Sequence, residues 1–525
     1  MWHTGIIGII NSDGLEDLVA KNLGMDRQRA CQRLSDTEPR ERALRYRGAA
    51  LPIHCACLSM IRSLMPDPMP SFTLVDVPGA VPLLGHLRAF KTRPLDLLST
   101  WWHQHGDALR FRLGPKALYL FSHPDLAEDV LVTQSERFAK VYDPRRPSGL
   151  ALVVGNGLVT ASGDVWKRHR RIIQPIFHRA RIATMADRMA QIGEQRMAGW
   201  AADEGQPIDI ADEMRQLTLE VISQTMFSSS MAQHIDRIRH ALQVSVKYAF
   251  DSFSHPLFLP QWVPTARNRE FRSVMQFMDE LMYGLLASRR QSGTTHDDLL
   301  GVLLHARDDV TGEGLTDEEL RDEALTIFIA GHETTATALS WTWYLLATHP
   351  EAKARFHEEV DRVLQGRTPT YEDLDHLPYT RAVFDESLRL YPPAPAVQRK
   401  AVTHTTVGGV SLPAGALILV SIYNLHRHPQ FWPTPDQFLP ERWLSGERPR
   451  SRYAYLPFGA GPRACVGSHF ASVEGPLLLA LIGLRYDLQL AQETVEPQVM
   501  VTLHPKDGLR MALRPRHAPV GSAAR

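Results

Sequence analysis

The amino-acid sequence predicts a mainly α-helical fold with small peripheral β-sheets. From residue 164 to residue 349, apolar side chains recur mostly at helical spacing. Short segments of alternating apolar residues flank this region, which is the pattern of half-buried strands. Gly114-Pro115 predicts a turn between the first two strands, and Lys506-Asp507-Gly508 predicts a turn that pairs the last two. The expected strands are residues 108–113, 117–122, 407–412, 417–422, 499–503 and 509–513.

Composition places the chain among ordinary globular proteins. It has 525 residues, of which 44% are hydrophobic and 22% charged, and its formal net charge is zero. A neutral chain has no general attraction to nucleic acid or to an anionic membrane. We expect one large catalytic domain at residues 71–517 and a tail at 518–525. Residues 1–70 are expected to be an extension that is disordered or lies ahead of the native start.

Few cysteines are present, namely Cys31, Cys55, Cys57 and Cys465. This number excludes a disulfide scaffold and favours a reducing compartment, so we expect a cytoplasmic location. The Cys55-Ala56-Cys57 segment lacks the spacing and the further ligands of a zinc site. No apolar run reaches the length of about 18 residues that a transmembrane helix needs.

Cys465 lies in a Gly- and Pro-rich loop at residues 458–467, ahead of an apolar helical segment at 470–484. The unpaired N–H groups and the positive dipole end of a helix N-terminus lower the pKa of a thiol. Glycines at positions 459, 461 and 467 would let a large flat ligand approach the backbone. A haem iron fits this setting, because Cys thiolate is one of its few protein ligands. The alternative is a structural cysteine in a surface loop.

A long helix is predicted in the middle of the chain. Thr316 and Glu319 match a capping box, and His349-Pro350 predicts the helix end, which gives about thirty residues or roughly 45 Å. Its centre, residues 330–335, combines a glycine, a charge and two threonines, which oppose helix propensity. Such conflicts often mark functional sites. Gly331 would allow a ligand to approach or the helix to widen, and a threonine hydroxyl can bond back to a carbonyl. The alternative is a kink whose polar side chains pair with other polar groups within the core.

These segments resemble the motifs of the cytochrome P450 family. The loop matches its F-x-x-G-x-R-x-C-x-G signature, and residues 330–335 match its A/G-G-x-D/E-T-T segment. Glu386 and Arg389 are similar to its E-x-x-R motif, and Trp166 and Arg170 to its W-x-x-x-R motif. The resemblance covers residues 72–517, opens with a Pro/Gly-rich hinge at 77–85, and implies the cytochrome P450 fold.

The resemblance also implies a haem b cofactor (iron protoporphyrin IX) with Cys465 as the metal ligand. Guanidinium groups and an indole N–H pair with carboxylates, so Trp166, Arg170, Arg399 and Arg463 are candidates to bind the haem propionates. The other cofactor contacts that it implies are Phe458, Gly461 and Gly467 on the cysteine side, and Ala330 and Gly331 on the side where oxygen binds.

Two further groups of residues take roles from the resemblance. Glu333 and Thr334 would be the catalytic acid–alcohol pair, which relays the two protons that the O–O bond needs in order to break. Glu386 and Arg389 share one helix face, and with Arg442 they would form a buried charge network behind the cysteine loop. Removing one member would cost about 3–5 kcal/mol. An isolated Glu–Arg pair is more commonly solvated.

The implied activity is haem-dependent monooxygenation of a lipophilic small molecule, such as a fatty acid or a terpenoid, by O₂. Two electrons would come from a separate ferredoxin or flavoprotein, since no stretch remains for a fused reductase. Arg168 and Arg171 would help to form a basic docking surface for that partner. The alternatives are a peroxide-driven haem-thiolate enzyme and a non-catalytic haem or ligand-binding protein, and Glu333-Thr334 disfavours both.

Apolar segments at residues 148–155 and 250–263 are expected to line the substrate pocket, although apolar loops are also common core elements. Phe258 and Trp262 would alternatively touch a membrane surface. In the helix after Cys465, Gly475-Pro476 predicts a kink. The pocket candidates are Leu150, Leu152, Val153, Val154, Phe253, Leu257, Phe258 and Trp262.

Overall fold

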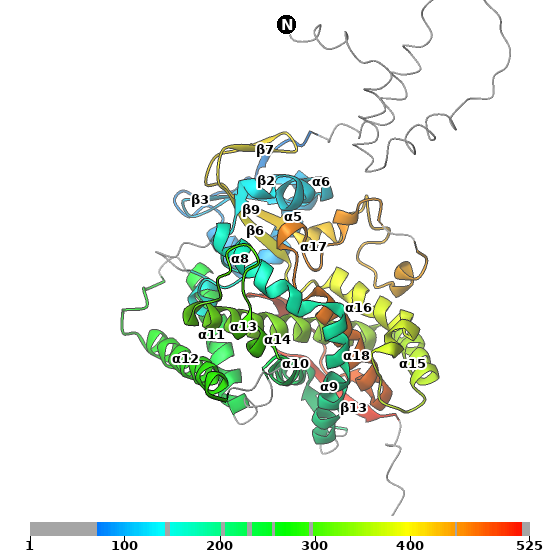
Figure 1. Ribbon diagram of the computed structural model, residues 1–525. Helices are drawn as coiled ribbons and strands as arrows, with labels where there is room; N and C mark the ends of the chain where they lie inside the picture. The colour runs from blue at the N-terminus through cyan, green and yellow to red at the C-terminus, as the bar shows by residue number, and fades with distance from the viewer. Residues whose placement is uncertain are drawn as a thin grey trace, which may run out of the picture. The chain divides into compact units, whose positions relative to one another are not determined.

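The computed structural model describes residues 71–141, 148–200, 205–227, 234–254, 258–292, 298–446 and 449–516. The expected extension at 1–70 and the tail at 518–525 lie outside these residues. The described chain is mainly helical with small sheets, which confirms the predicted fold class (Figure 1). Among these residues, no helix combines the length and the apolar character that crossing a membrane requires.

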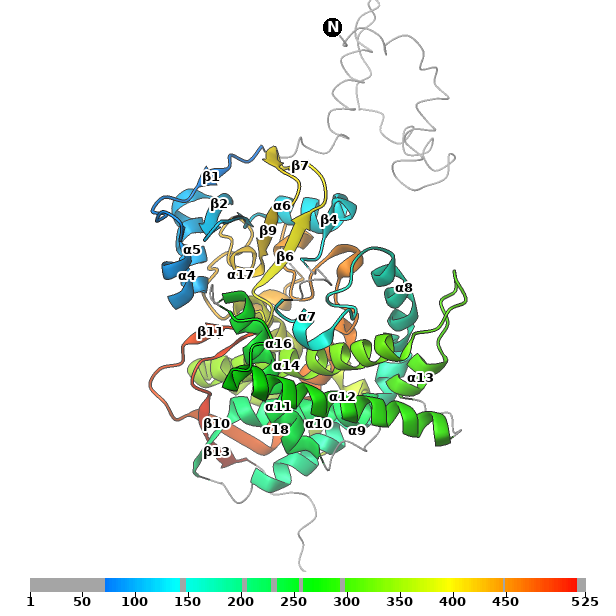
Figure 2. The same cartoon turned by 90° about the vertical axis from the view of Figure 1, so that its left-hand side faces the viewer.

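The largest sheet lies at one end of this unit and most long helices at the other, as two perpendicular views show (Figures 1 and 2). The helices are α4 (Leu87–Thr92), α5 (Pro94–His105), α6 (Pro124–Glu128), α7 (Ala151–Val154), α8 (Gly163–Ile173), α9 (Arg179–Ala198), α10 (Ile210–Met226), α11 (Ile235–Ser254), α12 (Ala266–Ser292), α13 (Leu299–His305), α14 (Asp317–Thr348), α15 (Pro350–Leu364), α16 (Pro378–Leu390), α17 (Ile422–Leu425) and α18 (Ser468–Arg485).

The strands form a six-stranded sheet of order β1-β2-β3-β9-β6-β4, a three-stranded sheet β10-β13-β5, and the hairpins β11-β12 and β7-β8. Their bounds are β1 (Val75–Asp76), β2 (Ala108–Leu113), β3 (Lys116–Phe121), β4 (Phe138–Ala139), β5 (Pro207–Asp209), β6 (Ala396–Ala401), β7 (Thr405–Val407), β8 (Val410–Leu412), β9 (Leu417–Ser421), β10 (Tyr486–Leu490), β11 (Pro497–Val499), β12 (Leu503–Pro505) and β13 (Arg510–Pro515).

Two strand predictions are wrong, whereas the β2–β3 hairpin and β9 are confirmed to within one residue. Residues 407–412 do not form one strand, because Gly408 and Gly409 have φ angles of 51° and 86° and turn the chain between β7 and β8. Residues 499–503 also do not form one strand, because residues 500–502 turn the chain between β11 and β12, and the predicted pairing with the last strand is absent. β12 pairs with β11, and β13 pairs with β10 and β5. Alternation of apolar residues reports which face is buried but not which strand is the neighbour.

Helix α14 runs through the middle of the helical part, with the predicted start and end confirmed. The Thr316 hydroxyl accepts from the N–H of Glu319 (3.2 Å), and the Glu319 carboxylate accepts from the N–H of Thr316 (2.9 Å). At the centre of α14, a Cβ on Gly331 would lie 2.6 Å from Cδ1 of Ile222 in α10. Gly331 therefore allows α10 to pack closely against α14, and its expected role in ligand approach stays a prediction.

Helix α18 follows the cysteine loop and continues as one helix through Pro476. Its residues 475–484 are buried, and a Cβ on Gly475 would overlap the ring of Phe384 in α16. The close approach of α16 and α18 behind the cysteine loop thus depends on this glycine.

We predict that Gly475→Ala lowers the free energy of unfolding by about 1–3 kcal/mol, because the added methyl overpacks the α16–α18 contact. Gly284→Ala is the matched control. It lies on an exposed face of α12 with nothing within 4 Å of the added Cβ, and should stabilise by about 0.5–1 kcal/mol. Denaturant unfolding measures both variants. Similar changes in the free energy of unfolding for the two variants would show that α16 and α18 are not tightly packed at this point.

Candidate active site

The cysteine loop, residues 458–467, is closed by its own backbone. The N–H of Cys465 donates to the carbonyl of Phe458 (2.9 Å), and the N–H of Ala464 donates to the carbonyl of Gly461 (3.0 Å). Gly461 has a φ of 69°, and a Cβ there would overlap the carbonyl oxygen of Leu131. Gly461 therefore serves the conformation of the loop and its contact with residues 129–133, and its expected role in ligand approach stays a prediction.

Cys465 is a free and exposed cysteine, although burial among protein atoms raises the pKa of its thiol. A hydrogen bond from the Gly467 backbone and the charge of Arg170 act in the opposite direction. The expected lowering of the pKa is therefore wrong for the protein alone, because desolvation outweighs the helix N-terminus. The Cys465 side chain keeps accessible surface although protein atoms surround it. We infer that it borders an interior space.

The centre of α14 also borders an interior space. Ala330 is exposed, whereas its neighbours Phe328 and Ile329 are 0% and 4% exposed. The Thr334 hydroxyl donates to the carbonyl of Ala330 (2.8 Å), so Thr334 lies one turn further along the same face. The predicted back-bonding of a threonine to the helix backbone is thus confirmed.

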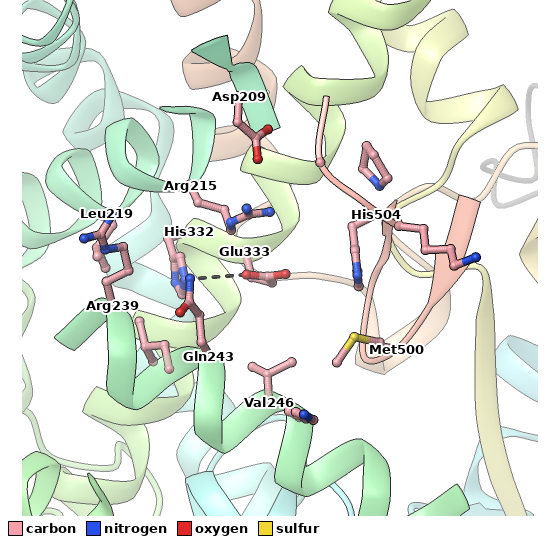
Figure 3. A pocket seen from close by; sticks show the side chains of 15 residues that line it. Asp209, Arg215, Leu219, Arg239, Gln243, Val246, His332, Glu333, Met500 and His504 are labelled. Atoms are coloured by element: carbon pink, nitrogen blue, oxygen red, sulfur yellow. Dashed lines mark ion pairs between the residues drawn. The ribbon is translucent and has the colours of Figure 1, made fainter. Parts of the chain in front are cut away.

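Glu333 points to a different place from Thr334. It lines a cavity of about 280 Å³ between α10, α11, α14 and β12, with His332 and His504 on either side of it (Figure 3). Its Oε1 accepts from the Thr502 hydroxyl (3.1 Å), and its Oε2 lies 3.7 Å from Nε2 of His332. Among the described residues, no hydrogen bond joins Glu333 to Thr334, so their joint role remains a prediction.

A group of cations near the cysteine loop has no carboxylate partner in the part of the chain that the structure describes. Burial and the charges of Arg399 and Arg463 lower the pKa of Lys140 to about 7. Burial and Arg463 lower the pKa of Arg399 to about 10, and burial and Arg170 lower that of Arg463 to about 10. These mutually repelling groups predict an anionic ligand between them.

Helix α8 is held against the cysteine loop by two of the predicted residues. The Arg170 guanidinium donates to the carbonyl of Ala464 (2.7 Å), and the Arg463 guanidinium lies 4.2 Å above the ring of Trp166. Arg463 also donates to the carbonyl of Ala161 (2.9 Å). Trp166, Arg170 and Arg463 therefore lie together at one edge of the loop.

Glu386 and Arg389 form a fully buried ion pair in α16, with two N···O distances of 2.9 Å. Arg442 (3.0 Å) and the indole N–H of Trp443 (2.9 Å) donate to the same carboxylate. Arg389 also donates to the backbone carbonyls of His426, Pro435 and Gln437 at 2.6–2.9 Å. Sequence reasoning assigned no role to Trp443, although the residue follows Arg442 directly.

A family model, cytochrome P450, matches residues 76–511 of the chain. The chain belongs to the cytochrome P450 family. It is 40% identical to cyclooctatin synthase of Streptomyces melanosporofaciens over 84% of this chain and 95% of that protein. It is also 39% identical to the cyclooctat-9-en-7-ol 5-monooxygenase of the same organism, over 80% and 90% of the two chains.

Two further comparisons agree. Pentalenene oxygenase of Streptomyces avermitilis is 32% identical over 85% of this chain and 98% of its own. The crystal structure of the cytochrome P450DA heme domain superposes with a TM-score of 0.76 at 29% identity, covering 85% of this chain and 99% of that one. This P450 is therefore a monooxygenase that uses haem.

The described residues fit a haem. Cys465 offers an accessible thiol, and metal coordination deprotonates a thiol even where burial raises its pKa. Lys140, Arg399 and Arg463 offer unpaired positive charge for the two propionate groups. Sequence reasoning missed Lys140, because this residue belongs to none of the motifs and only the fold brings it near the arginines.

A second cluster of metal-ligand types, Asp107, His123 and His428, lies at the edge of the large sheet. Nδ1 of His123 accepts from the N–H of Asp125 (3.2 Å), and Nδ1 of His428 accepts from the N–H of Gln430 (3.4 Å). Because each Nδ1 accepts, each Nε2 carries the ring proton and is not free for a metal. The cluster is therefore a hydrogen-bonded structural contact.

Arg168 and Arg171, the expected docking residues, are neutralised by acidic partners. Arg168 pairs with Glu319, and Arg171 with Asp308 (2.6 Å). Between them on α8, His169 is 0% exposed and has a carboxylate at each ring nitrogen, Glu323 at 2.6 Å and Glu319 at 3.2 Å. These residues therefore join α8 to the start of α14, which leaves little free charge for a partner.

The expected substrate-lining segments divide between core and surface. Val153 and Val154 are buried core residues, and Leu150, Leu152 and Phe258 pack against that core. Trp262 is 78% exposed and does not line an enclosed pocket. Leu257 and the side chain of Phe253 lie outside the described residues.

We predict that His169 stabilises the fold in a pH-dependent way. Burial, the largest effect, lowers the pKa of His169, but the hydrogen bonds and charges of Glu323 and Glu319 outweigh it and raise that pKa. The charged imidazole therefore contributes stability below about pH 6.5, and this contribution is lost as the pH rises through the raised pKa. His169→Gln should cost more free energy of unfolding at about pH 6 than at about pH 9. An equal loss of unfolding free energy at the two pH values would contradict a charged His169 in the folded protein.

Proposed function

We propose that this P450 inserts one atom of O₂ into a lipophilic, terpenoid-like small molecule, while the other atom leaves as water. The observation that carries the proposal is the accessible Cys465 thiol, set deep in the protein beside cations that have no carboxylate partner among the described residues. The substrate class is supported by the relatives, whose names refer to pentalenene and to cyclooctat-9-en-7-ol, both unsaturated ring molecules.

In this proposal Cys465 ligates the iron of haem b, which supplies oxygen activation. Lys140, Arg170, Arg399 and Arg463, with Trp166, hold the propionate edge. Ala330 borders the substrate, and the Thr334 hydroxyl holds a proton donor near the reacting oxygen. Phe458 and Gly467 complete the cysteine loop around the ligand atom, and the Glu386–Arg389–Arg442 network keeps that loop in place.

Proton supply is assigned to Glu333. Its carboxylate lies on the cavity side of α14, and Thr334 lies one residue further along the same helix. A carboxylate that alternates between water in the cavity and the Thr334 side can move protons through the helix layer. We further propose that electrons come from a separate ferredoxin or flavoprotein. We also propose a cytoplasmic location, which the small number of cysteines supports.

The proposed function is tested by turnover of the purified haem-loaded protein with NADPH and a surrogate reductase and ferredoxin, beside a peroxide-only arm. Candidate substrates come from a spectral-shift screen of terpenoids and fatty acids. With ¹⁸O₂ we expect product that carries one labelled oxygen atom. Product formed only with peroxide, or label absent from the product, would contradict O₂-dependent monooxygenation. A preference for fatty acids would overturn the terpenoid assignment.

We predict that Thr334→Ala keeps its haem but lowers the product formed per NADPH by at least about tenfold, with peroxide released instead, because oxygen loses its proton donor. Thr348→Ala is the matched control. Thr348 lies at the exposed end of α14 and makes the same type of bond, to the carbonyl of Tyr344 (2.9 Å). Coupling of NADPH to product measures both variants, and unchanged coupling in Thr334→Ala would refute its role.

A further inference from the structure

The cavity that Glu333 lines has a mixed wall. Charged side chains from α10, α11 and the β12 segment line it together with apolar ones such as Leu242, Val246 and Met500 (Figure 3). Arg215, Arg239, Lys247 and Lys506 line it, whereas Asp209 directs Oδ1 to the backbone N–H groups of Ala211 and Leu509. Glu333 is therefore the carboxylate best placed in this wall to exchange protons with the water of the cavity.

Two histidines flank Glu333, and their surroundings differ. His332 is 3% exposed, and its Nδ1 donates to the carbonyl of Phe328 (3.0 Å), so its ring is fixed within the helix layer. His504 is half-buried in the cavity wall, and its Nδ1 is buried without a hydrogen-bond partner among the described residues. His504 lines the same cavity as Glu333, and no hydrogen bond or ion pair joins the two among the described residues, so a proton passes between them through the cavity water. The more accessible His504 is the histidine that can exchange protons with this water.

The backbone holds His504 firmly in place. The indole N–H of Trp341 in α14 donates to the carbonyl of Leu503 (2.6 Å), and the N–H of Leu503 donates to the carbonyl of Pro393 (3.0 Å). The Thr502 hydroxyl bonds Glu333 at 3.1 Å. The segment 502–504 is thus fixed to α14 on both sides of the position where the imidazole faces the cavity.

We propose that His504 is a relay residue that reloads Glu333 with protons from the water of this cavity. This inference rests on the proposed function, in which Glu333 supplies protons to oxygen. A ring nitrogen of His504 takes a proton from hydronium in the cavity, which becomes water. The imidazolium then passes the proton through cavity water to a carboxylate oxygen of Glu333, and the imidazole is neutral again. Two such transfers supply the two protons of one turnover, and no electron moves in these steps.

The charges around His504 suit this role. Burial, the largest effect, and Arg215 lower the pKa of His504, while Glu333 and the Thr502 backbone act to raise it. His332 and Arg215 also face Glu333 across the cavity, and burial lowers the pKa of His332 as well. An imidazolium in this setting is a stronger acid than in water, so it gives up its proton readily. The same shift makes the neutral imidazole a weaker base, so it takes its next proton from hydronium.

The test compares O₂-driven with peroxide-driven turnover in the full-length haem-loaded protein. Peroxide carries both protons that the O–O bond needs, so its use bypasses Glu333 and His504. His504→Gln should lower NADPH- and O₂-driven product formation by about tenfold or more and enlarge the solvent isotope effect, while peroxide-driven turnover stays at the wild-type rate. The part of the pH–rate profile that follows the titration of a histidine should disappear in this variant. His404→Gln, an exposed histidine bonded to Ser411 (3.0 Å), is the matched control and should change nothing.

Unchanged O₂-driven turnover in His504→Gln would overturn the relay. An equal loss in both arms, or loss of the thiolate-type spectrum of the reduced CO complex, would also overturn it, since either shows a structural role. A wild-type protein that forms no product from O₂ defeats the proposed function itself, whatever the variant does.

Discussion

Unpaired positive charge beside the cysteine loop is the constraint on which the rest of the site depends. Among the described residues, Lys140, Arg399 and Arg463 repel one another and have no carboxylate partner. Arginine does not escape this by losing its proton under ordinary conditions. A buried charge without a partner is costly, so an anionic ligand between these groups would stabilise them. In the proposed function haem is that ligand, and its iron binds the accessible thiol of Cys465.

The structure keeps this strained region between two rigid supports. On the cysteine side, the Glu386 carboxylate accepts from Arg389, Arg442 and Trp443, so its charge is fully compensated. On the opposite side, α14 is capped at its start and packed against α10 at Gly331. The Glu386 carboxylate is fully paired, although Ser387 Oγ in α16 and Trp343 Nε1 in α14 are buried without a hydrogen-bond partner among the described residues. The two supports hold the fold, and the cations beside the cysteine loop are left for a ligand.

Much of the fold could be predicted from local patterns, but pairing between distant segments could not. The capping box at Thr316 and the β2–β3 turn are local, and both were predicted correctly. The neighbours of β13 in the sheet could not be predicted in this way. They are β10 and β5, and β5 lies roughly three hundred residues earlier in the chain. Burial is likewise a property of the whole fold. The loop around Cys465 has the features that lower a thiol pKa, yet desolvation by the surrounding protein raises it.

The candidate site shows the same division. Motif spacing indicated Cys465, Glu386 and Arg389, which belong to short segments with fixed patterns. Lys140 and His504 belong to no such pattern, and only tertiary structure brings them to the arginines and to Glu333. Arg168 and Arg171 seemed free for a partner in the sequence, but their acidic partners lie more than a hundred residues away.

The central claim, that the unpaired cations bind the propionates of the haem, is tested most directly by reconstitution of the haem-free full-length protein. The two ligands to compare are haem and haem dimethyl ester, which lacks the propionate charges. Each lost charge-assisted contact costs about 1.5–3 kcal/mol, so the account predicts that haem binds about a hundredfold more tightly or better. Equal affinity for haem and its ester would contradict the account.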